Sequence, residues 1–191
     1  MVFAQLAFWT GFGAATAIIG SLIVTLRTRV SLWPPGEHSG KAALHWGLVA
    51  IFDVALLVLA VLEWNAWILP RPASLGVGLV LSGAGAWLFL ASSRSMTGAE
   101  TAGRAADTLH TEGLYARTRN PQYLGMIVGM VGFALLANAL LVSVLVGLHV
   151  FWVLLLPFAE EPWLRERFGD QYEAYCERVP RFVDRRSVWR P

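Results

Sequence analysis

The sequence is poor in charge, holds a single lysine and has almost no cysteine. Charged residues make up 15% of its 191 residues, against about 25% in ordinary globular chains. Hydrophobic residues make up 56%, and the mean hydropathy is +0.55. A soluble fold of this size cannot bury so much apolar surface, so the composition excludes a cytosolic enzyme and a nucleic-acid-binding protein. The single cysteine, Cys176, excludes an intrachain disulfide.

Long uncharged stretches predict the membrane-spanning helices. Residues 1–26 and 72–93 contain no Asp, Glu, Lys or Arg, and residues 42–62 contain only Asp53. Each stretch is long enough to cross the hydrocarbon core, which takes about 20 residues. The first basic residues follow the first stretch instead of preceding it, so we interpret this stretch as an uncleaved span and not as a signal peptide.

A fourth uncharged stretch is too long for one span. Residues 120–159 contain no charge, and as one helix they would be about 60 Å long, roughly twice the hydrocarbon thickness. We expect the chain to turn back at Ala137-Asn138-Ala139 and to form two shorter spans. The predicted fold is therefore all-α: a polytopic integral membrane protein with five transmembrane helices, of which the last two form a helical hairpin, plus a short cytoplasmic C-terminal helix.

The basic residues predict the orientation in the membrane. All of them except Arg71 lie in the connection after the first span, in the connection after the third span, or in the C-terminal tail. Since cytoplasmic loops carry an excess of Lys and Arg, we expect a cytoplasmic C-terminus and an N-terminus outside. We interpret residues 1–191 as one membrane domain, in which residues 1–93 form a three-span scaffold and residues 94–191 form the catalytic half.

Two polar segments at the predicted cytoplasmic face carry the candidate site residues. Asn120 and Pro121 suit the N-cap and the first position of the fourth span, whose free N–H groups attract anions. Arg119 adds a full positive charge. Glu160 and Glu161 are expected at the end of the fifth span, where the helix dipole disfavours carboxylates and a bound cation would offset this cost. We expect the positive and negative groups to face each other across one pocket.

A series of motifs runs through these segments in order, namely Gly113-x-Tyr115, Arg119-Asn120-Pro121-x-Tyr123-x-Gly125, Glu160-Glu161, Phe168-Gly169, Tyr172-x-x-Tyr175 and Val179-Pro180-Arg181-Phe182. The series resembles the isoprenylcysteine carboxyl methyltransferase family, which belongs to a wider group with the phospholipid N-methyltransferases. The resemblance covers about the last eighty residues. It implies a helical membrane enzyme that binds S-adenosylmethionine in a cytoplasmic-facing pocket and takes a lipophilic acceptor from the bilayer.

The chemistry of that cofactor fits these residues. Arg119 with the start of the fourth span would hold its carboxylate, and Glu160 or Glu161 would hold its ammonium group. Arg119 and Glu160 are the expected catalytic residues, and they would act through orientation and exclusion of water. No metal is expected, because the sequence has no cluster of metal ligands. The expected cofactor-binding residues are Gly113, Leu114, Tyr115, Arg119, Asn120, Pro121, Tyr123, Glu160 and Glu161.

Two alternative functions and the identity of the acceptor stay open. Sterol reductases have a similar Arg-x-Pro-x-Tyr region, which would imply NADPH as the cofactor. A non-catalytic membrane subunit could keep the motifs by descent. The resemblance to the eukaryotic enzymes implies an arginine shortly before the paired glutamates, which would orient an acceptor carboxylate. Residues 154–159 contain no arginine, so we expect the nucleophile of the acceptor to be a thiol, an amine or a weakly held carboxylate. We expect the partners to be membrane lipids and a lipid or lipophilic substrate, with no nucleic acid.

Glycine is frequent in the third and fourth spans. Small residues let the backbones of membrane helices approach closely. We therefore expect these glycines to serve helix packing and not to contact a cofactor. They are Gly76, Gly78, Gly83, Gly85, Gly125, Gly129 and Gly132.

Overall fold

The computed structural model describes residues 1–28, 30–36, 39–67 and 69–184. Four of its helices are long and apolar enough to cross a membrane, and α5 is a shorter apolar helix of 17 residues. Arg29, Arg185, Arg186 and Arg190, which contribute to the predicted orientation, lie outside the described residues. The predicted polytopic helical membrane fold is confirmed. The elements are α1 (Val2–Arg27), α2 (Ser39–Leu62), α3 (Arg71–Ser93), α4 (Gly98–Thr101), η1 (Gly113–Ala116), α5 (Pro121–Ala137), α6 (Leu140–Phe168) and α7 (Asp170–Arg178).

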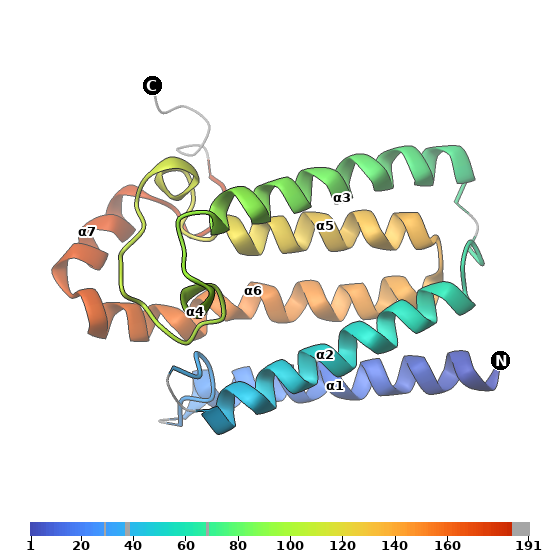
Figure 1. Cartoon of the computed structure of the whole chain (residues 1–191), viewed down its shortest axis with the longest axis horizontal. Helices are drawn as coiled ribbons and strands as arrows, with labels where there is room; N and C mark the ends of the chain where they lie inside the picture. Colours follow the sequence, from blue (N-terminus) through green and yellow to red (C-terminus); the bar gives the residue numbers. More distant parts are fainter. Residues whose placement is uncertain (29, 37–38, 68, 185–191) are drawn as a thin grey trace.

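The five longer helices lie side by side in one bundle, with the connections at its two ends (Figure 1). Helix α6 contacts α1, α2 and α5, and so joins the α1–α2 pair to the α3–α5 pair. Its buried side chains pack with those of α1 and α2 into one apolar core. The loop after α1, the connection from α3 to α5, and α7 gather at one end, while the N-terminus lies at the other (Figure 1).

The predicted hairpin turn falls at Asn138. Helix α5 ends at Ala137, α6 begins at Leu140, and Asn138 takes the left-handed conformation with φ 47° and ψ 52°. The Asn138 side-chain amide donates hydrogen bonds to Asn65 Oδ1 at 2.7 Å and to the Leu69 carbonyl at 3.1 Å. The turn is therefore fastened to the connection between α2 and α3 at the same end of the bundle.

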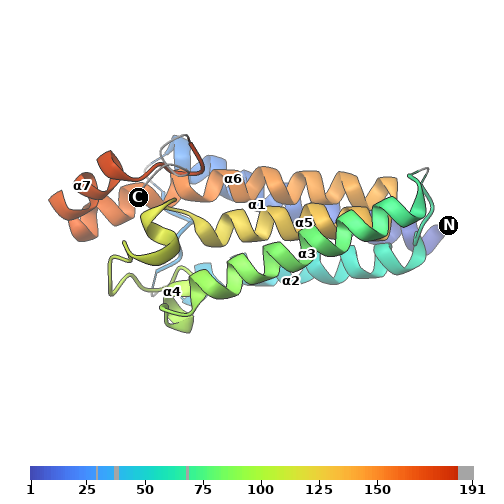
Figure 2. The same ribbon diagram turned by 90° about the horizontal axis from the view of Figure 1, so that it is seen from above.

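Glycines let α3 and α5 touch backbone to backbone, and the two helices lie side by side in both views (Figures 1 and 2). A Cβ on Gly85 would lie 2.2 Å from the Gly129 nitrogen, and one on Gly132 would lie 2.4 Å from the Ser82 nitrogen. Only glycine fits at these two positions without a clash against the backbone of the other helix. The expected packing role is confirmed for Gly78, Gly85, Gly125 and Gly132, whereas Gly76 and Gly83 face open space.

The end of the last span differs from the prediction. Helix α6 continues past Glu160 and Glu161 to Phe168, with Pro157 and Pro162 inside it. The two carboxylates therefore lie within the helix and not at its terminus. They are tolerated there because side chains from distant segments donate hydrogen bonds to both carboxylates, so neither carboxylate depends on solvation at a helix end. The predicted position of Glu160 and Glu161 at the end of the span, where the helix dipole would disfavour them, is therefore wrong.

Candidate functional site

A pocket lies at the end of the bundle, where α5 begins and α6 extends beyond the core. The cavity has a volume of about 110 Å³. Its walls come from the start of α5, the last turns of α6, α7 and the connection between α3 and η1. The predicted site residues Tyr115, Arg119, Asn120, Tyr123, Glu160 and Glu161 line it together.

The other three predicted site residues do not line this pocket. Gly113 and Leu114 line a neighbouring hollow, bounded by residues 91–95 and 108–115. Gly113 has φ +60°, and a Cβ there would meet open space, so its glycine serves the backbone conformation of the turn. Pro121 is fully buried at the first position of α5. Whether any of the three contacts a cofactor stays a prediction.

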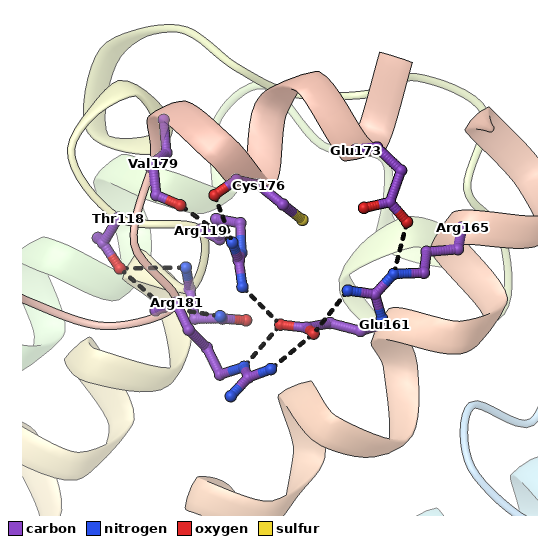
Figure 3. Close-up of polar contacts among 9 residues, drawn as sticks. Thr118, Arg119, Glu161, Arg165, Glu173, Cys176, Val179 and Arg181 are labelled. Atoms are coloured by element: carbon purple, nitrogen blue, oxygen red, sulfur yellow. Dashed lines mark hydrogen bonds and ion pairs between the residues drawn. The ribbon is translucent and has the colours of Figure 1, made fainter. Parts of the chain in front are cut away.

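Glu161 is the centre of a buried ion-pair network (Figure 3). It is 3% exposed. Arg119 Nη2 donates to its Oε1 at 2.8 Å, and Arg181 donates through Nε at 2.6 Å and through Nη2 at 2.7 Å. Arg165 Nη2 lies 3.6 Å from Oε2. The sequence places Arg119 and the glutamates across a pocket from each other, whereas the structure pairs Arg119 directly with Glu161.

Arg119 also fastens the C-terminal end of α7. Its Nη1 donates to the carbonyls of Cys176 at 3.1 Å and Val179 at 3.0 Å, and its backbone N–H donates to the Pro180 carbonyl at 2.9 Å. The last carbonyls of a helix have no partner within the helix, so Arg119 supplies donors that α7 lacks. This arginine therefore joins α5, α6 and α7 into one wall of the pocket.

Asn120 and Arg181 form hydrogen bonds that the motifs did not predict. Asn120 occupies the N-cap position of α5 but makes no side-chain cap; its Nδ2 donates instead to the Arg181 carbonyl at 2.8 Å. The Arg181 side chain forms the bidentate pair with Glu161, and this hydrogen bond raises the pKa of Arg181 above its usual range. The signal for Arg181 is present in the sequence, as the arginine of the Val179-Pro180-Arg181-Phe182 motif.

Glu160 lies beside Glu161 but has different partners. Trp33 Nε1 donates to Glu160 Oε1 at 2.9 Å, and the Tyr123 hydroxyl donates to the same oxygen. Both donors are neutral. Among the described residues, no Lys, Arg or His forms an ion pair with Glu160. A carboxylate without a cation therefore lines the pocket. No motif in the sequence points to Trp33, which lies 127 positions from Glu160 in the chain.

Two tyrosines of α7 form part of the pocket wall. Tyr172 and Tyr175 are 2% and 3% exposed and line the pocket. The Tyr175 hydroxyl donates to the Tyr115 carbonyl at 2.7 Å. Burial raises the pKa of all three tyrosines above the ordinary value, so they stay protonated at neutral pH and Tyr175 keeps its hydrogen bond. Helix α7 is thereby tied to η1 across the pocket.

A capping box shapes the wall between α3 and η1. The Glu100 N–H donates to Thr97 Oγ1 at 3.2 Å, the Thr97 N–H donates to Glu100 Oε2 at 2.8 Å, and the Thr108 N–H donates to Glu100 Oε1 at 3.3 Å. Partial burial acts to raise the pKa of Glu100, but these hydrogen bonds outweigh it and lower the pKa. The Thr-x-x-Glu spacing is a known signature of such a box, and could have been found in the sequence.

Comparison of the sequence with models of known protein families identifies the family of this chain. The model of the phospholipid methyltransferase family matches residues 73–171, just over half of the chain. The chain belongs to this family. The matched range begins in α3 and ends in α7, so this phospholipid methyltransferase domain includes Arg119, Glu160 and Glu161 but not Trp33. The wider group named from the motifs is confirmed, and the family is one of membrane methyltransferases.

One curated relative is the cobalt-zinc-cadmium resistance protein CzcN of Cupriavidus metallidurans, which is 28% identical over 151 residues. The alignment covers 76% of this chain and 64% of the relative. No solved structure matches the chain. Within the part of the chain that the structure describes, no three His, Cys, Asp or Glu side chains gather as metal ligands. The expectation that the protein uses no metal stays a prediction.

Proposed function

We propose that this family member is an S-adenosylmethionine-dependent methyltransferase that binds its cofactor in the pocket between α5, α6 and α7. One observation carries the proposal: Glu160 lines the pocket with a carboxylate that no cation of the described residues neutralises. A cationic ligand would supply the missing charge. S-adenosylmethionine, when bound, supplies a methyl group activated by a positively charged sulfur.

The residues around Glu160 fit the other parts of such a ligand. Glu160 would hold the ammonium group, with its Oε1 already oriented by Trp33 and Tyr123. Arg119 Nε is buried and has no hydrogen-bond partner among the described residues, so Arg119 retains a donor for a carboxylate despite its pairing with Glu161. The side chains of Tyr115 and Tyr123 would pack against the adenine or the methionine end. These groups bind, orient and exclude water, which is what transfer of a methyl group requires.

The acceptor is proposed to be an amphiphile or small lipophile that enters from the bilayer. A second hollow adjoins the pocket and shares Met96 and Thr101 with it. The small apolar residues Ala42 and Ala43 at the start of α2 line this hollow, and Arg104 lines it as well. An apolar tail fits this hollow. Arg104 offers the basic group that residues 154–159 lack, so an isoprenylcysteine-type carboxylate remains among the candidate acceptors beside thiols and amines.

The orientation belongs to the proposal as well. The pocket lies at the end of the bundle that carries the connection from α3 to α5 and helix α7. The positive-inside rule assigns this end to the cytoplasm, where a soluble cofactor is available. The N-terminus would then lie outside.

The proposal is tested by binding of S-adenosylhomocysteine to the detergent-solubilised protein, measured by calorimetry. We expect saturable binding, and a dissociation constant that rises roughly tenfold to a hundredfold in Glu160→Gln, the effect of losing a charge-assisted hydrogen bond. Glu166→Gln, an exposed position on the same helix, is the matched control and should bind as the wild type. Binding of NADPH in place of S-adenosylhomocysteine would favour the reductase, and binding of neither would favour a non-catalytic subunit.

A further inference from the structure

We infer that Trp33, in the loop between α1 and α2, is a positioning residue of the cofactor pocket. It acts by fixing the carboxylate of Glu160 toward the ligand. The inference rests on the proposed function. Trp33 lies outside the matched family range of residues 73–171, so neither the motifs nor the family assigns it a role.

The contact between Trp33 and Glu160 orients the carboxylate without neutralising it. The indole Nε1 lies 2.9 Å from Glu160 Oε1, and the indole is 3% exposed. The Tyr123 hydroxyl donates to the same oxygen. Two donors on one oxygen fix the rotation of the carboxylate, while the described residues make no hydrogen bond to Oε2. Because both donors are uncharged, neither of them neutralises the carboxylate, and it can pair with a cationic group in the pocket.

The indole is itself held from three sides. It packs against the ring of His45 in α2, with ring centroids 4.1 Å apart and a tilt of 35° between the planes. The backbone N–H of Trp33 donates to Thr25 Oγ1 of α1 at 3.3 Å. A Cβ on Gly103 would lie 3.0 Å from the Trp33 ring, so the absence of a side chain there lets the wall of the pocket close onto the indole. Because the Trp33 side chain is already fixed, little conformational entropy is lost there when Glu160 binds a ligand.

This arrangement couples the first two membrane helices to the pocket. Glu160 belongs to α6 and Tyr123 to α5, whereas Trp33 is fixed to α1 and α2. The position of the Glu160 carboxylate thus depends on how the α1–α2 pair sits against the family domain. A role confined to packing would require only the ring of Trp33; a positioning role also requires its N–H.

Trp46 provides a matched comparison in the same part of the fold. Its Nε1 donates to the Ala102 carbonyl at 3.3 Å, so it ties α2 to the same wall, but it does not touch Glu160. Phenylalanine at either position keeps an aromatic ring and removes the donor. Comparing Trp33→Phe with Trp46→Phe therefore separates the loss of a structural hydrogen bond from the loss of the bond to the carboxylate.

The test is a double-mutant cycle in S-adenosylhomocysteine binding by the full-length protein. We expect Trp33→Phe to raise the dissociation constant about five- to tenfold, and Trp46→Phe to leave it within about twofold. In the Glu160→Gln background, Trp33→Phe should add less than about twofold, because Trp33 acts through that carboxylate. An equal effect of Trp33→Phe in both backgrounds would overturn the inference, as would an equal effect of Trp46→Phe.

A second measurement checks the contact itself without any ligand. In protein labelled with ¹⁵N-tryptophan, the indole resonance of Trp33, assigned by its loss in Trp33→Phe, should shift in Glu160→Gln and stay in place in Glu166→Gln. An unmoved resonance means that Trp33 does not touch the carboxylate, and it overturns the inference. Failure of the wild type to bind S-adenosylhomocysteine is a separate result: it removes the proposed function, and the positioning role with it, while the resonance still reports on the contact.

Discussion

Arg119 and Glu161 form a direct ion pair, with 2.8 Å between Arg119 Nη2 and Glu161 Oε1. Their side chains are only 10% and 4% exposed. The pair joins the residue preceding α5 to the last part of α6, and Arg119 holds α7 at the same time. These two charges of the motif thus build the pocket wall, while Glu160 next to them lines the pocket and forms no ion pair among the described residues.

Arg119→Ala should therefore destabilise the protein as well as weaken ligand binding. Removing one partner leaves the Glu161 carboxylate with less compensation in a buried site, a change that costs about 3–5 kcal/mol for a buried pair. We expect the midpoint of thermal unfolding in detergent, measured without ligand, to fall clearly. Arg117→Ala, at an exposed position nearby, is the control. An unchanged midpoint in Arg119→Ala would contradict the structural role.

Gly85→Ala should loosen the contact between α3 and α5. Its Cβ would lie 2.2 Å from the Gly129 nitrogen, which is backbone and has no rotamer to yield. Forced overpacking of this kind costs about 1–3 kcal/mol. Gly83→Ala, on the same helix but facing open space, should have no such cost and is the matched control. Thermal unfolding of the two variants distinguishes the cases, and equal midpoints would show that the helices do not approach so closely.

The orientation can be tested with single cysteines in a Cys176→Ser background. Glu112→Cys lies at the pocket end of the bundle and Ala66→Cys at the other end, and both positions are exposed. A membrane-impermeant maleimide should label Ala66→Cys in right-side-out vesicles and Glu112→Cys in inside-out vesicles. The reverse pattern would place the pocket outside. Labelling of both cysteines from one side would mean that the helices do not cross the membrane.

The capping box at Glu100 should make stability depend on acid pH. The folded state lowers the pKa of this carboxyl, so its contribution is fully present above the unfolded pKa of about 4.3 and is lost as the pH falls through the folded pKa. The difference in unfolding midpoint between wild type and Glu100→Gln should therefore be larger at pH 7 than at pH 3. A constant difference would mean that the charge of Glu100 does not contribute.

Much of the architecture follows from local properties of the chain. Uncharged stretches of about 20 residues have few options other than spanning the membrane, and a forty-residue stretch has to fold back, which the structure does at Asn138. Glycines at helical spacing predicted close helix packing, and the structure shows that α3 and α5 are the two helices that meet there. The motif series placed Tyr115, Arg119, Asn120, Tyr123, Glu160 and Glu161 in one site, and they do line one pocket.

Sequence alone determined which segments enter the membrane and which residues gather at one end, because hydrophobicity and the length of a span act locally. Only the tertiary structure decided how the charges are shared: Arg119 and Arg181 neutralise Glu161, and the neutral donors Trp33 and Tyr123 hold Glu160. Adjacent glutamates point to different sides of a helix, since each residue turns by about 100°. Which partner each carboxylate meets therefore depends on helices and loops far away in the chain, and no local pattern records that.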